Sequence, residues 1–184
     1  MVAVVLAVED GRLAAGISRV EHRSAESLEQ ALGRAIDVGA LGHVEQLETR
    51  VLRDGTLATA YLGLARTALG APPASDDERE LVDAARARLR AKLSYTNVGF
   101  ALAPATFTIS ELREVYVAAL GHDVSATNLQ RVLLRRGVLE RLGGLRAPGR
   151  SGGRPAALFR FASRRLEITD EFAALRPPGS RASG

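Results

Sequence analysis

The sequence contains no cysteine and no tryptophan, and aromatic residues make up only 4% of its 184 positions. Without cysteine, disulfide frameworks, cysteine-ligated zinc or iron–sulfur sites and thiol catalysis are excluded. A long hydrophobic run is also missing, because the apolar opening MVAVVLAV ends at Glu9 and is too short to span a bilayer. No basic segment precedes it, so the sequence indicates neither a signal peptide nor a membrane anchor, and we expect a cytoplasmic protein.

Acidic residues are scarce in the second half of the chain. Residues 1–100 carry 12 basic and 14 acidic side chains, whereas residues 101–184 carry 13 basic and 7 acidic ones. Ten arginines but a single acid, Glu140, lie between Arg131 and Arg165. A basic half joined to a nearly neutral half predicts a polyanion partner for one part of the chain only. The alternative is a solvated basic face without a partner.

The first 70 residues have the pattern of a small β-rich domain with one helix. Val2–Val8 is a continuous apolar run rich in β-branched residues, which is typical of a strand buried on both faces. The segment GAPPAS at 70–75 interrupts all regular patterns and indicates a domain boundary. The predicted elements are strands at 2–8 and 12–18, a helix at 24–36 capped by Gly39, and strands at 44–52 and 56–65.

Residues 75–162 have the element order of a winged helix. Ser75 is a suitable N-cap for a helix that runs to about Leu93. Two helices joined by about four residues then match a helix-turn-helix, and two strands around an arginine- and glycine-rich loop follow. These elements are predicted at 109–120, 125–136, 138–142 and 156–161, with the loop at 143–153. Residues 163–184 form a C-terminal extension whose composition from Arg176 on predicts a disordered tail.

The second helix of this pair has the side chains that a DNA-recognition helix needs. Asparagine and glutamine can pair with adenine, arginine with guanine, and threonine can contact the thymine methyl group. The outward face carries Thr127, Asn128, Gln130, Arg131 and Arg135. Arginines on the following loop can contact phosphates or enter a minor groove, and these are Arg146, Arg150 and Arg154. An exposed polar helix face without a partner is the alternative.

Patterns for catalysis, metal binding or nucleotide cradling do not emerge. The three histidines, His22, His43 and His122, have no metal-ligand spacing, and no serine lies in a GxSxG context. The glycine-rich loop lacks a following GKS or GKT. We therefore expect no catalytic residues, no metal and no cofactor.

Three separated segments together resemble one known family, the Nudix-related transcriptional regulators often called NrtR. They are FTISELREVY at 107–116, NLQR at 128–131 and GRPAALFRF at 153–161. The resemblance implies an α+β protein with a reduced Nudix-like α/β sensor and dimerisation domain over 1–70 and a winged helix-turn-helix DNA-binding domain over 75–162. It further implies a sequence-specific repressor that binds double-stranded DNA as a homodimer, associated with the nucleoid. Its regulon would belong to NAD or sugar metabolism, and ADP-ribose or a related nucleotide sugar would be its effector.

The N-terminal half departs from the Nudix pattern in its metal site. In that pattern, glutamates on a loop–helix–loop hold divalent metals against a pyrophosphate. Residues 26–39 occupy this place and keep the arginine of the motif as Arg34. The paired glutamate positions hold Val38 and Gly39, or Ile36 and Asp37 in an alignment shifted by two residues. We therefore expect no enzymatic activity.

Two other functions remain open from the sequence. One is a divergent Nudix hydrolase that uses an unrecognised metal site. The other is a winged-helix protein-interaction module whose arginines bind polyanions without sequence preference.

Overall fold

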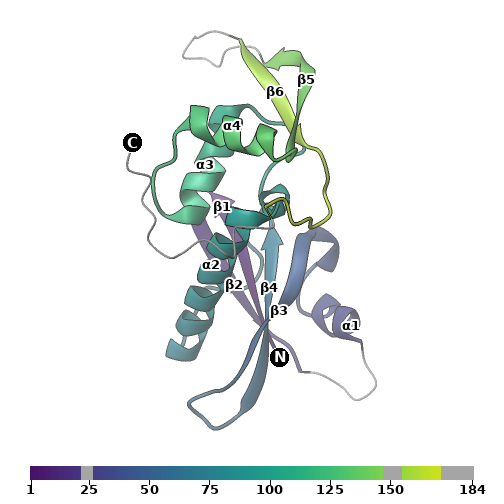
Figure 1. The fold of residues 1–184 in the computed structure, drawn as a ribbon. Coiled ribbons are helices and arrows are strands. Elements are labelled where there is room, and N and C mark those ends of the chain that lie inside the picture. Colours follow the sequence, from purple (N-terminus) through teal and green to yellow (C-terminus); the bar gives the residue numbers. More distant parts are fainter. Residues whose placement is uncertain (22–26, 147–154, 171–184) are drawn as a thin grey trace.

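The computed structural model describes residues 1–21, 27–146 and 155–170, and it places a winged helix at one end of a mixed sheet (Figure 1). The predicted α+β class is confirmed. In chain order the elements are β1 (Val2–Glu9), β2 (Arg12–Arg19), α1 (Leu28–Gly33), the 3-10 helix η1 (Val38–Ala40), β3 (Leu41–Val51), β4 (Leu57–Ala65), α2 (Asp76–Tyr95), the 3-10 helix η2 (Val98–Ala101), α3 (Ile109–Leu120), α4 (Ala126–Arg135), β5 (Leu139–Arg146) and β6 (Ala156–Phe161).

The larger sheet in the described residues has the strand order β2-β1-β4-β3, with β1 parallel to β4 and the other pairs antiparallel. β1 is buried on both faces, as its apolar run predicts. Alternate residues point to opposite sides: Val4 and Leu6 belong to the core under α2, whereas Ala3 and Val5 belong to a second core that includes the α1 residue Leu32. This central position fixes the register of the whole N-terminal sheet.

Helix α1 is shorter than predicted. It begins after Ser27, whose side chain accepts a hydrogen bond from the Gln30 N–H, and it ends at Gly33. The predicted continuation to residue 36 and the cap at Gly39 were wrong, because the chain turns into η1. There the Asp37 carboxylate accepts a hydrogen bond of 3.0 Å from the Gly39 N–H. The start of the predicted helix, including Glu26, lies outside the described residues.

Helix α2 begins at the predicted cap, Ser75, and lies against the sheet (Figure 1). Its buried apolar stripe consists of Leu81, Val82, Ala85, Leu89 and Leu93. These residues share one hydrophobic cluster with the strands on one side and with α3 and α4 on the other. The division into domains at 70–75 stays a prediction, and α2 shares a core with both parts of the molecule.

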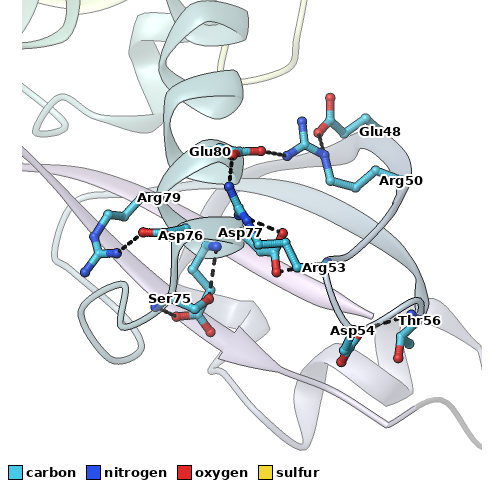
Figure 2. A network of polar contacts seen from close by, with 11 residues as sticks. Glu48, Arg50, Arg53, Asp54, Thr56, Ser75, Asp76, Asp77, Arg79 and Glu80 are labelled. Atoms are coloured by element: carbon cyan, nitrogen blue, oxygen red, sulfur yellow. Dashed lines mark hydrogen bonds and ion pairs between the residues drawn. The ribbon is translucent and has the colours of Figure 1, made fainter.

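Ion pairs connect the β3–β4 hairpin to the first turns of α2 (Figure 2). Arg53 contacts the Asp77 carboxylate at 3.1 Å and the Glu80 carboxylate at 2.6 Å. Arg50 contacts Glu80 at 2.9 Å and Glu48 at 2.7 Å. Because Arg53 and Glu80 are exposed, salt screens their attraction, and the network orients the hairpin more than it stabilises the fold.

Glu78 is a buried carboxylate that closes the N-terminal cap of α2. It accepts hydrogen bonds from the Ala74 N–H at 2.7 Å and from the Arg19 guanidinium at 2.9 Å. Burial by itself raises the pKa of Glu78, but the Ala74 N–H, the Arg19 side chain and the Ser75 N–H outweigh it and hold the pKa below its usual value of 4.5. The ionised form therefore stabilises the folded state.

We expect Glu78→Gln to destabilise the protein at neutral pH, because the amide loses the charge that these donors stabilise. The higher stability of the wild type should be fully present above about pH 4.5, the usual pKa of a glutamate. It should be lost as the pH falls through the lower pKa of Glu78 in the folded state. Denaturant unfolding of both proteins measures the difference in their free energies of unfolding. It is carried out from about pH 3 to about pH 7, in steps of about one pH unit. A stability difference that stays constant across this range would contradict it.

The winged helix has its predicted elements, except that β5 continues to Arg146 and thus includes residues 143–146, which the sequence predicts as loop. Thr108 caps α3 and Gly121 ends it in the left-handed conformation at φ 76°, a backbone geometry that favours glycine. Ser125 caps α4, and β5 pairs with β6 in an antiparallel ribbon. The Phe107 backbone, just before α3, pairs with Phe159 of β6, which positions the ribbon against the helices.

Residues after β6 return to the end of α2. The Asn97 side chain donates to the Arg165 carbonyl at 2.8 Å and accepts from the Glu167 N–H at 2.8 Å. Arg136, the residue that follows α4, donates to the Thr169 hydroxyl at 2.9 Å. The first part of the C-terminal extension therefore connects the ends of α2 and α4. The predicted disordered tail from Arg176 lies outside the described residues.

Candidate nucleic-acid interface

Helix α4 presents one polar and one buried face. Leu129 and Leu133 are buried against the core of the winged helix. Four of the five predicted recognition residues are exposed and Gln130 is half-buried; the exposed ones are Thr127, Asn128, Arg131 and Arg135. Leu134 is 38% exposed and interrupts this polar surface. The arrangement leaves amide, hydroxyl and guanidinium groups free to contact base edges.

Arg131 and Asn128 act as a pair one helical turn apart. The Arg131 guanidinium donates a hydrogen bond of 2.7 Å to the Asn128 side-chain oxygen. This contact restrains a long side chain that otherwise has many rotamers, so less entropy is lost when its planar fork binds a base. The sequence shows that both residues lie on one face, but only the structure shows that one orients the other.

A hollow of about 210 Å³ lies beside α4, where the start of α3 meets the β5–β6 ribbon. Gln130 of α4, Ser110 of α3 and Arg141 of β5 line it. Arg141 is exposed and has no ion pair or hydrogen bond within the described part of the chain. Sequence analysis did not select Arg141, although its place on the strand after α4 makes it a candidate for a phosphate contact.

The predicted loop arginines have different positions. Arg146 ends β5 and forms an ion pair with Glu111, whose other carboxylate oxygen accepts a hydrogen bond from the Thr108 N–H at 2.7 Å. In this conformation Arg146 connects the ribbon to the start of α3 instead of pointing away from the protein. The other two, Arg150 and Arg154, lie outside the described residues.

The region that corresponds to the Nudix motif serves a structural purpose. The Arg34 guanidinium donates to the Glu21 carbonyl, and Asp37 caps η1. Within residues 1–21, 27–146 and 155–170, no group of three or more histidine, aspartate and glutamate side chains is placed to hold a metal ion. In the same ranges, no helix has both the length and the apolar character to cross a membrane.

The described histidines have hydrogen-bond partners of their own. His43 lies 3.1 Å from the Glu45 carboxylate, which also accepts from Lys92 at 2.6 Å. Burial raises the pKa of Glu45, but hydrogen bonds from Lys92 and His43 outweigh this and hold it below its usual value. His122 contacts the Asp123 carbonyl at 3.0 Å, and His22 lies outside the described residues.

A capped helix-turn-helix with a polar second helix, followed by a two-stranded ribbon, defines a winged-helix protein, here joined to a small mixed sheet. Residues 99–161 match the family model of the NrtR DNA-binding winged helix domain. The winged-helix part of the chain is therefore similar to that of NrtR, and the resemblance predicted from the sequence is confirmed.

Relatives of known structure or function agree with this assignment. The ADPR responsive transcriptional repressor NtrR of Acinetobacter baylyi is 36% identical over 86 residues, which are 47% of this chain and 33% of that protein. The match thus spans about a third of that relative's length. Shewanella oneidensis NrtR in complex with a 27mer DNA superposes with a TM-score of 0.65 at 25% identity, covering 86% of this chain and 91% of that one. NrtR from the same organism without DNA gives a TM-score of 0.61 at 23% identity. The likeness in fold extends over 86% of this chain and so includes part of the N-terminal sheet, for which the sequence predicts a Nudix-like domain.

Proposed function

We propose that the protein is a sequence-specific DNA-binding transcriptional repressor without catalytic activity, which places α4 in the major groove. The observation that carries the proposal is the exposed face of α4, where Asn128 orients Arg131. Two relatives support it: one is named as a repressor, and the other was solved in complex with DNA. A DNA-binding repressor acts at the chromosome, so we place the protein in the cytoplasm.

The contacts divide into base reading and phosphate binding. Thr127, Asn128, Gln130, Arg131 and Arg135 read or brace the major groove, and Arg146, Arg150 and Arg154 contact the backbone or the minor groove. Arg141 joins the phosphate contacts because it lies free beside Gln130. For Arg146 this role requires that DNA phosphate replaces Glu111 as its partner.

The proposal includes a homodimer on a palindromic site and a nucleotide-sugar effector such as ADP-ribose. A dimer of winged helices presents two equivalent α4 helices, which match two half-sites related by twofold symmetry. The name of the Acinetobacter relative supports an ADP-ribose response. The Nudix motif of this chain supports binding of the nucleotide sugar without its hydrolysis. The paired glutamate positions supply one carboxylate at most, since they hold Val38 and Gly39 or, in the shifted alignment, Ile36 and Asp37.

The first test is selection of a preferred duplex from a random DNA library by the full chain at near-physiological salt. A preferred sequence bound about 10³-fold or more tightly than random DNA supports a specific regulator. Release of that duplex by ADP-ribose supports the effector. Binding without preference, lost uniformly as salt rises, would instead support the interaction module, and magnesium-dependent turnover of ADP-ribose would support the hydrolase.

We expect Arg141→Ala to weaken binding about equally on the selected and on random duplexes. Its guanidinium would contact a phosphate, and phosphate contacts carry no sequence information. The slope of log affinity against log salt should become shallower by roughly one. Arg150→Ala should behave in the same way. Arg86→Ala is the matched control, because this half-buried arginine lies on α2 and pairs with Asp83 at 3.3 Å. An unchanged salt slope for Arg141→Ala would contradict the phosphate contact.

A further inference from the structure

A second basic site lies at the junction between the sheet and the winged helix, away from α4. It is a hollow of about 290 Å³, lined by Arg66, Arg164, Phe100 and the segment 39–42, and we call it the junction hollow. Arg66 directly follows β4, and Arg164 lies in the segment after β6, which passes close to the end of β4 (Figure 1). The site therefore combines side chains from both parts of the molecule.

Both arginines of the junction hollow are exposed, and neither has a hydrogen bond or an ion pair within the described residues. The Arg164 guanidinium carbon lies 5.9 Å from the centre of the Phe100 ring, a cation–π contact that positions it without neutralising its charge. No acidic side chain is among the described residues that line this hollow. Two like charges facing one concave space repel each other, and a bound anion would relieve that repulsion.

The lining of the junction hollow also includes two glycines. Gly39 and Gly42 have no side chains to cover their peptide groups. Gly42 also packs closely against η2: a Cβ atom at this position would lie 2.7 Å from the Ala101 Cα. The site is thus formed by a tight contact between β3 and η2 that a larger residue would disturb.

A larger hollow of about 620 Å³ adjoins the junction hollow, and Arg66 and Ala40 line both. Its lining includes the carboxylates of Asp10 and Glu114 beside apolar Leu102. Carboxylates accept hydrogen bonds from hydroxyl groups and repel further phosphates. The two hollows therefore suit a ligand with one anionic end and one hydroxyl-bearing end.

We propose that the junction hollow binds the phosphate group of a small polyhydroxylated phosphate monoester. The phosphate lies between the guanidiniums of Arg66 and Arg164, which present planar donor forks to its oxygens. The hydroxyl-bearing body extends into the larger hollow towards Asp10 and Glu114. The site does not depend on DNA binding by α4, and it goes beyond the repressor function proposed above.

The test is calorimetric titration of the full chain with ribose 5-phosphate, inorganic phosphate and uncharged ribose. We expect saturable binding of both phosphates, tighter for ribose 5-phosphate, and none of ribose at the same concentrations. Arg66→Gln and Arg164→Gln should each weaken phosphate binding roughly tenfold or more, because each removes a charge-assisted contact. Asp10→Asn should weaken ribose 5-phosphate and leave inorganic phosphate unchanged.

Arg86→Gln is the matched control, since it removes the same charge from a half-buried position on α2. Absence of saturable phosphate binding by the wild-type chain would overturn the proposal, as would equal weakening by Arg86→Gln. Thermal melting of each variant shows whether it is folded, and Arg66→Lys, which keeps the charge but not the fork, should retain part of the affinity. Binding of the selected duplex is measured in parallel. If Arg66→Gln weakens DNA binding and not phosphate binding, the arginine belongs to the DNA interface and the phosphate-site proposal fails. If the wild-type protein shows no DNA sequence preference, only the proposed repressor function is contradicted.

Discussion

Replacement of Arg131 by alanine is expected to weaken binding of the selected duplex by about 1–3 kcal/mol and to relax the preference at one base position. The guanidinium is exposed on α4 and oriented by Asn128 at 2.7 Å, so it reaches the groove as a restrained fork. A bidentate contact of arginine to guanine is the commonest specific contact in the major groove and discriminates against a wrong base by about 1–3 kcal/mol. Fluorescence anisotropy with the selected duplex and its single-base variants measures both effects.

Asn128→Ala extends this experiment, because it leaves the guanidinium in place and removes the atom that restrains it. We expect a smaller loss than for Arg131→Ala, and the two effects should not add, since the side chains interact directly. Arg86→Ala again serves as the control for net charge. Equal weakening of the selected and random duplexes by Arg131→Ala would show that this arginine contacts phosphate instead of a base.

Replacement of Phe107 by alanine is expected to destabilise the fold by about 3–5 kcal/mol, the range for truncation of a buried phenylalanine. Its side chain is fully buried, and its ring centre lies 5.4 Å from that of Phe161 in an edge-on arrangement. The Phe161 ring in turn contacts Phe100 at 6.5 Å. The truncation therefore opens a cavity where α3, the β5–β6 ribbon and η2 meet.

Denaturant unfolding monitored by far-UV circular dichroism measures this loss of stability. The comparison requires that wild type and variant have the same m-value, the slope of the free energy of unfolding against denaturant concentration. Phe107→Leu is the control, because it keeps most of the volume and should cost less than about 1.5 kcal/mol. A loss below about 1 kcal/mol for Phe107→Ala would mean that the aromatic cluster repacks. The backbone pairing of Phe107 with Phe159, at 3.0 and 2.8 Å, should persist in both variants.

The regular elements could be predicted because their local signals agree with their tertiary environment. The continuous apolar run of β1 reflects burial on both faces, and the cap residues Ser75 and Ser125 precede α2 and α4 where the sequence predicts. The exposed face of α4 could also be predicted, because the buried positions Leu129 and Leu133 fix which side faces outward.

Features that depend on contacts between distant segments could not be predicted. Arg146 was selected for its place near a glycine-rich loop, but its partner Glu111 is 35 residues away in the sequence. Arg141 could not be predicted as a DNA-contacting residue, because only the folded structure places it beside Gln130. The junction hollow has no local signal at all, since Arg66 and Arg164 meet only through the fold.

The pairing of β1 with β4 has a consequence for how the protein folds as it is made. Val2 lies beside Ala60 in a parallel pair, so one edge of β1 has no partner until the ribosome has released β4. The α2 side chains that cover one face of β1 emerge later still. During this interval the edge of β1 that β4 will pair with and the face that α2 will cover are exposed on the nascent chain. β1 thus leaves the ribosome before β4 and α2 but is fully buried only after both have followed it, and this favours chaperone capture over early collapse.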